Sequence, residues 1–197
     1  MLLSVSQNIG HQVKYSRLAE DFTNPTIKKA FELMETARIF KKVISSSPEG
    51  IPLGANTADK TFKTIMLDIG LLSRFSGFST SVEFQKTDLL SIFRGSLAEQ
   101  FVGQELISAG HSELYYWSRH AKSSSAETDY LIEKNNEIIP IEVKSGAAGS
   151  LKGLHLLLNT YPNIKKGFIF SDASYGEIIE QKLVFIPMYF VFSSCGI

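Results

Sequence analysis

The sequence predicts an α/β protein (α+β overall) because helix-like and strand-like patterns follow one another along its second half. A helix-like stretch at 94–106 is followed by a strand-like run at 114–117 and by a β-hairpin at 127–144. A second helix-like segment at 151–159 and a strand-like segment at 166–170 complete an αβββαβ order. Such an order packs helices against a β-sheet.

The hairpin at 127–144 is the most informative of these elements. Its two β-prone runs flank Asn135-Asn136, and asparagine tolerates the φ > 0 angles of a two-residue hairpin turn. This turn places Lys134 opposite Glu137 and thereby fixes the register of the whole ladder.

Counting outward from the turn brings two carboxylates together. Asp129 falls opposite Glu142, and Glu127 falls opposite Lys144. Both pairs fall at non-hydrogen-bonded positions, where opposed Cα atoms are about 4.5 Å apart. Asp129, Glu142 and Lys144 are therefore expected on one face of the hairpin.

Two carboxylates at this spacing repel each other, so a cation is expected between them. Asp129 and Glu142 offer only oxygen ligands, which suit Mg²⁺ or Mn²⁺. Lys144 is an alternative source of positive charge without a metal. Glu127 opposite Lys144 can equally form a simple cross-strand ion pair.

The spacing of these residues resembles a known signature. Asp129, twelve intervening residues and Glu142-Val143-Lys144 resemble the Asp…Glu-x-Lys motif of the PD-(D/E)XK nucleases, whose core is restriction-endonuclease-like with an αβββαβ order. The resemblance implies that Asp129, Glu142 and Lys144 are catalytic. It also implies that Glu99, on the preceding helix, joins Asp129 and Glu142 as a metal ligand, although a surface or capping role for Glu99 remains open.

A second resemblance covers nearly the whole chain. The segments that carry it are 62–72, 99–106, 115–117, 127–129 and 141–146. In this order they resemble the C-terminal region, called domain of unknown function 4143, of a prokaryotic AAA+ ATPase family. The resemblance implies an ATPase module, normally in the same polypeptide, as a partner.

This chain itself contains no Gly-x-x-x-x-Gly-Lys-[Ser/Thr] motif, so no ATPase activity is expected from it. Met1 is accordingly expected to begin either an excised piece of a longer protein or a truncated reading frame.

The N-terminal region has a different character. A short helix is predicted at 13–22, and a second helix begins with Asn24 as N-cap and Pro25 at its first position. With a possible strand at 41–44, this order resembles a winged helix-turn-helix.

Lys28 and Lys29 fall on the exposed side of the second helix, where such folds contact DNA. The alternative, which we prefer, is that these two lysines only solvate a packing helix.

We therefore expect a winged-helix-like segment at 1–50, a connecting segment at 51–85 and a nuclease-like domain at 86–197. Twenty basic and twenty acidic residues give zero net charge, so only a local patch can bind DNA. The longest apolar run, 183–192, contains Pro187 and is too short to span a membrane. The single cysteine, Cys195, excludes an internal disulfide and suits a reducing cytoplasm.

Two functions remain in view. The first is a Mg²⁺-dependent phosphodiesterase that acts on DNA. The second is a catalytically inactive DNA-binding, protein-interaction or regulatory module of the ATPase. The complete set of Asp129, Glu142 and Lys144 favours the first, and the neutral net charge favours the second. The sequence defines no oligomeric state.

Overall fold

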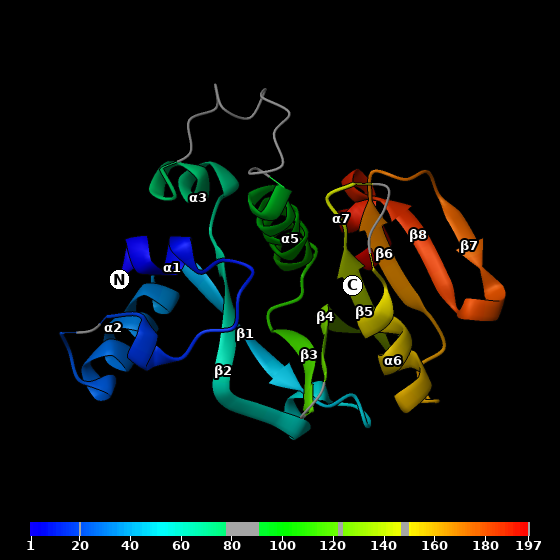
Figure 1. The fold of residues 1–197 in the computed structure, drawn as a ribbon, viewed down its shortest axis with the longest axis horizontal. Helices are drawn as coiled ribbons and strands as arrows, with labels where there is room; N and C mark the ends of the chain where they lie inside the picture. Colours follow the sequence, from blue (N-terminus) through cyan, green and yellow to red (C-terminus); the bar gives the residue numbers. More distant parts are fainter. Residues whose placement is uncertain (20, 78–90, 122–123, 147–149, 197) are drawn as a thin grey trace.

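The computed structural model describes residues 1–19, 21–77, 91–121, 124–146 and 150–196 (Figure 1). Within them the chain forms an eight-stranded mixed sheet with helices packed against it, which confirms the predicted α/β class. The elements are α1 Leu2–Gln7, α2 Asn24–Thr36, β1 Phe40–Ser46, β2 Thr57–Met66, α3 Ile69–Phe75, α5 Ser91–Ser108, β3 Leu114–Ala121, β4 Ser124–Lys134, β5 Glu137–Val143, α6 Lys152–Thr160, β6 Gly167–Ser171, β7 Gly176–Ile178, β8 Leu183–Pro187 and α7 Val191–Cys195.

The strand order is β2-β1-β3-β4-β5-β6-β8-β7. β1 pairs antiparallel with β2 and parallel with β3, so the N-terminal strands extend the same sheet as the later ones. The predicted connecting segment at 51–85 thus contributes β2 to the sheet. The predicted boundary between residues 85 and 86 lies outside the described residues.

The predicted hairpin is confirmed as β4 and β5. Asn135 and Asn136 have φ angles of 52° and 59°, as a two-residue turn of this kind requires. The register begins at Lys134 and Glu137, as predicted, and continues in step to Tyr130 opposite Ile141.

The neighbouring elements also follow the sequence pattern. The helix predicted at 94–106 lies within α5, and the strand predicted at 114–117 lies within β3. The helix predicted at 151–159 and the strand predicted at 166–170 coincide with α6 and β6 to within one residue at each end. The αβββαβ order is therefore present.

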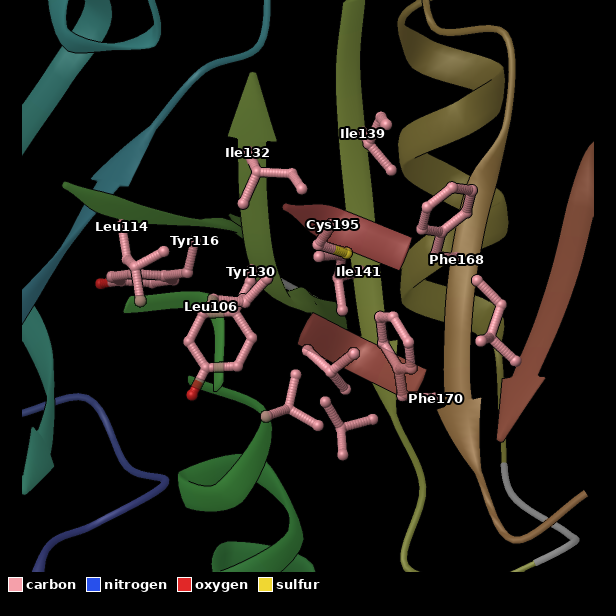
Figure 2. Close-up of a cluster of buried hydrophobic side chains, with 14 of the residues drawn as sticks. Leu106, Leu114, Tyr116, Tyr130, Ile132, Ile139, Ile141, Phe168, Phe170 and Cys195 are labelled. Carbon is pink, nitrogen blue, oxygen red and sulfur yellow. The ribbon is translucent and has the colours of Figure 1, made fainter. Parts of the chain in front are cut away.

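Helices cover both faces of the sheet. α5 and α7 pack on one face, in a core that includes Tyr116, Tyr130, Ile141 and Phe170 (Figure 2). The leucines of α6 pack on the other face, in a second core. Tyr116 belongs to the first core, whereas its neighbours on β3 belong to the second, as side-chain alternation along a strand requires.

The prediction of an α-helix at 13–22 is wrong. Among the described residues 13–19 and 21–22, the one helical element is a 3₁₀ turn at Tyr15–Arg17. The competing interaction is a β-bridge between Val13 and Phe62, whose backbone groups exchange two hydrogen bonds. These bonds hold the segment extended against β2 and prevent it from coiling.

The second predicted N-terminal helix exists as α2, but its N-cap is Thr23 rather than Asn24, and Pro25 lies in its first turn. Ile27 and Phe31 are buried in a third apolar core between α2 and the β1–β2 end of the sheet. Without an α-helix at 13–22, the resemblance to a winged helix-turn-helix is not confirmed. None of the described helices is long and apolar enough to cross a membrane.

Candidate functional site

The predicted site lies where β4 and β5 stop pairing. Their ladder ends at Tyr130 and Ile141, one pair before Asp129 and Glu142. Beyond this point the Asp129 side chain continues the contact, because its Oδ2 accepts a hydrogen bond of 2.8 Å from the backbone N–H of Val143. The carboxylate is thereby fixed between the two strand ends.

A β-bulge in β4 coincides with this position. Tyr115 pairs with Leu131 and Trp117 pairs with Thr128, so two steps along β3 match three steps along β4. The extra residue lies in the segment that contains Asp129. Bulges redirect side chains and are common beside active sites.

Glu142 and Lys144 form an ion pair at the C-terminal end of β5. Lys144 Nζ donates to Glu142 Oε1 at 2.6 Å. Glu142 is only 7 % exposed, and its second oxygen, Oε2, is buried without a hydrogen-bond partner. The Lys144 side chain is 22 % exposed, whereas the Lys63 side chain is only 3 % exposed.

The predicted cross-strand contact between Glu127 and Lys144 does not form. β5 ends at Val143, and Lys144 turns to Glu142 instead. Glu127 forms an ion pair with a residue that the sequence did not single out, Lys63 of β2.

Lys63 stands at the centre of a charged cluster, defined here as Lys63, Glu99, Glu127, Asp129, Glu142 and Lys144. The Lys63 side chain is buried, and its Nζ lies 2.8 Å from Glu99 Oε1 and 3.6 Å from Asp129 Oδ1. It also contacts Glu127 Oε1. Glu99, predicted as a metal ligand, thus lies against an internal ammonium group.

The electrostatics of the cluster follow from burial. Burial alone would lower the pKa of Lys63, but the carboxylates of Glu99, Asp129 and Glu127 raise it well above its ordinary value, so Lys63 is positively charged. Burial raises the pKa of Glu142 to about 8; Asp129 adds to this rise and Lys144 opposes it. The raised pKa of Glu142 therefore follows first from burial and then from the neighbouring carboxylate, and that of Lys63 from its carboxylate partners.

Neighbouring polar groups hold the carboxylates on the Lys63 side in place. The Gln12 amide donates to Glu127 Oε2 at 2.7 Å, and Tyr130 Oη donates to the backbone carbonyl of Glu99 at 2.8 Å. Gly10 lies beside Glu99, where an added Cβ would be 3.4 Å from Glu99 Oε2. The N-terminal segment at 10–12 therefore forms part of the wall of the cluster.

Lys63 and Gln12 are the residues that sequence reasoning missed. Lys63 and Glu99 are 36 residues apart, so no local motif links them. The available signal was a single lysine between Phe62 and Thr64 in a β-prone run with apolar residues on both sides. A lysine buried in such a strand requires a carboxylate partner.

The two lysines predicted as a weak nucleic-acid contact lie elsewhere. Lys28 and Lys29 are exposed on α2, as expected. Lys28 lies 3.7 Å from Glu32, one helical turn away, and not against the charged cluster. Their role in DNA binding stays a prediction.

The structure leaves fewer candidate ligands for a divalent ion than the three that the sequence predicts. Among the described residues, no three His, Cys, Asp or Glu side chains are arranged to hold a metal ion together. Asp129 and Glu142 remain as two candidate ligands, and Glu142 Oε2 supplies a buried oxygen without a partner. Mg²⁺ is commonly held by one or two carboxylates, with water and substrate phosphate completing its shell.

Fold and site together define a mixed α/β protein with a buried acidic cluster at the open end of a β-hairpin. Residues 94–191 match the family described as "Domain of unknown function (DUF4143)", which confirms the DUF4143 part of the predicted resemblance over that range. Residues 1–82, including the segment 62–72, match a different family, "Domain of unknown function (DUF8612)". No curated protein and no solved structure matches the chain.

Proposed function

We propose that this chain is a nuclease-like module, a Mg²⁺- or Mn²⁺-dependent phosphodiesterase that acts on DNA. One observation carries the proposal. Glu142 Oε2 is buried without a hydrogen-bond partner, although its carboxylate neighbours both Asp129 and Lys144. A buried carboxyl oxygen without a hydrogen-bond partner is costly, and a cation that replaces the proton of Glu142 would remove this cost.

Asp129 and Glu142 would hold the ion in this proposal. Asp129 is kept in place by the Val143 N–H, which leaves its other oxygen, Oδ1, with Lys63 at 3.6 Å as its nearest ionic partner. Such an ion, when bound, lowers the pKa of a water molecule and offsets the charge of a phosphate.

Lys144 would supply the positive charge that faces the substrate. Its ammonium group is held at 2.6 Å from Glu142, and its side chain is partly exposed. An ammonium group in this position stabilises the negative charge that develops on a phosphate during cleavage. Lys63 cannot take this role, because its side chain is buried beneath the carboxylates.

The biological setting belongs to the same proposal. The resemblance to the C-terminal region of AAA+ ATPases suggests that a P-loop module works with this chain and delivers or remodels the DNA. The zero net charge suits such delivery, since a chain without a basic excess gains little non-specific DNA affinity of its own.

The test is a cleavage assay on single-stranded and duplex DNA with Mn²⁺ or Mg²⁺, paired with calorimetry of Mn²⁺ binding. We expect weak cleavage with little sequence preference, lost in Asp129→Asn, Glu142→Gln and Lys144→Ala. Lys165→Ala is the matched control, because Lys165 forms an exposed ion pair with Glu137 away from the cluster. Cleavage that persists in Lys144→Ala would identify a contaminating nuclease.

A second candidate is a non-catalytic interaction module, and a specific observation favours it. Tyr189, Phe190 and Phe192 are 75 %, 47 % and 53 % exposed near the C-terminal helix. Three neighbouring exposed aromatic side chains suit a protein interface. A wild-type chain that binds neither Mg²⁺ nor Mn²⁺ at millimolar concentration with DNA present, and cleaves no DNA, would establish this candidate over the nuclease.

A further inference from the structure

A cavity of about 580 Å³ lies between the two parts of the chain that match different families. One side of it is formed by residues between 35 and 67, and the other by residues between 104 and 112. None of its lining residues belongs to the charged cluster. Sites for small ligands typically have volumes of about 300–1,000 Å³ and often lie where two structural units meet.

Part of the cavity wall is apolar. Phe40, Ile65 and Met66 are buried beside the cavity, and Ile107 of α5 is partly buried. Leu67, directly after β2, also lines the cavity and is 56 % exposed. A ligand with an apolar body would remove this leucine from water, which a small inorganic ion would not do.

The charges on the wall are unbalanced. The charged lining residues are Glu35, Arg38 and Lys41. Glu35 Oε1 accepts a hydrogen bond of 3.0 Å from the Lys42 N–H and lies 3.9 Å from Lys41 Nζ. Within the described part of the chain, no ion pair or hydrogen bond involves the Arg38 guanidinium. Arg38 thus offers paired N–H donors to a carboxylate, sulfonate or phosphate group.

The termination of α2 does not explain why residue 38 is an arginine. Arg38 has a φ angle of 57°, and the next N–H, that of Ile39, donates to the Met34 carbonyl at 3.0 Å. Helices that end in this way usually have glycine at the left-handed position, because other side chains are strained there. Glycine would therefore close α2 at least as well, and the guanidinium calls for another role.

Gln104 provides an independent sign of a missing hydrogen-bond partner. It lines the cavity from α5, and its Oε1 is buried without a partner among the described residues. A ligand that brings an N–H or O–H donor to this wall would satisfy that oxygen.

We propose that this cavity binds a small organic anion with an apolar body. The apolar part lies against Leu67 and Ile107, and the anionic group is held by Arg38. The site is independent of the proposed nuclease, because the cavity and the charged cluster share no residue.

The experiment compares two fluorescent probes on the full chain. Anilinonaphthalene sulfonate has an apolar ring system with one anionic group, and phenylnaphthylamine has the same ring system without it. We expect Arg38→Gly to weaken binding of the sulfonate probe by about tenfold or more, because charge-assisted hydrogen bonds are lost. The uncharged probe should bind this variant as it binds wild type.

Two controls separate the site from the fold. The thermal midpoint of Arg38→Gly should equal or exceed that of wild type, because glycine adopts a positive φ without strain. Lys165→Ala removes a positive charge from an exposed ion pair outside the cavity and should match wild type with both probes. Ser108→Trp, at an exposed position on the cavity wall, should weaken binding of both probes.

Three results would overturn the inference. They are equal affinity of the sulfonate probe for wild type and Arg38→Gly, no binding of either probe by wild type, and binding of both probes that Ser108→Trp leaves unchanged. If Arg38→Gly lowers the thermal midpoint, Arg38→Asn takes its place, since asparagine also tolerates a positive φ. It must then show the same selective loss of the sulfonate probe.

Discussion

The two lysines of the charged cluster carry the same charge but differ in burial and in the number of carboxylates that they contact. Lys63 is buried on β2 and contacts three carboxylates, whereas Lys144 is partly exposed at the end of β5 and contacts one. A buried cation with several partners cannot move toward a substrate, and its removal destabilises the fold because it leaves buried carboxylates unpaired. An accessible cation with one partner stabilises little and is free to meet a phosphate. The fold thus separates two uses of the same side chain.

Replacing Lys63 by methionine should produce the largest loss in the free energy of unfolding. The change leaves three carboxylates without their cation, and breaking a buried ion pair in this way costs about 3–5 kcal/mol. Urea denaturation followed by circular dichroism would measure the loss in the free energy of unfolding. A loss below about 1 kcal/mol would mean that Lys63 contributes no more to stability than an exposed ion pair does, and so no more than Lys144.

Gly103→Ala should lower the free energy of unfolding by an intermediate amount, because it disturbs the packing of α5 against β2. An added Cβ would collide with Ile65 Cδ1 and would lie 2.6 Å from Tyr130 Oη. Overpacking of this kind costs about 1–3 kcal/mol.

The matched control is Gly95→Ala on the same helix, where an added Cβ meets nothing within 4 Å. This change should stabilise the protein by up to about 1 kcal/mol through helix propensity alone. Equal thermal midpoints for the two variants would mean that the α5–β2 contact around Gly103 is not tight.

Lys144→Gln should have the smallest effect on stability. The loss should stay below about 1 kcal/mol, because the side chain is partly exposed and has one partner. DNA cleavage, if present, should fall by about 10²-fold or more, since charge stabilisation in the transition state is lost. Denaturation and cleavage measured on the same preparation would sharpen the comparison. A stability loss as large as that of Lys63→Met would mean that the two lysines share one structural role.

The part of the site that contains Lys144 was predicted from the sequence, whereas the part that contains Lys63 was not. The hairpin followed from Asn135-Asn136 and the alternation around it, because turn chemistry and strand register are local properties. The register placed Asp129 beside Glu142, and the structure keeps the two as neighbours.

The rest of the site depends on contacts that no local pattern encodes. The bulge in β4 and the end of the ladder at Tyr130 change which partner Glu127 meets. Lys63 reaches the cluster only because β1 pairs with β3 and carries β2 with it. The extended backbone at Val13, where an α-helix was predicted, has the same origin, since Val13 bonds to Phe62 far along the chain.

The burial of Lys63 also has a consequence for synthesis on the ribosome. Glu99, the first of its carboxylate partners to be made, follows Lys63 by 36 residues, which is roughly 2–7 s at ordinary translation rates. During this interval the nascent β1–β2 hairpin has no β3 beside it, and the ammonium group has none of its later carboxylates. A charge that points inward on an unpaired strand opposes its association with other chains. We therefore expect the lysine that finally completes the interior to oppose aggregation of the unfinished chain first.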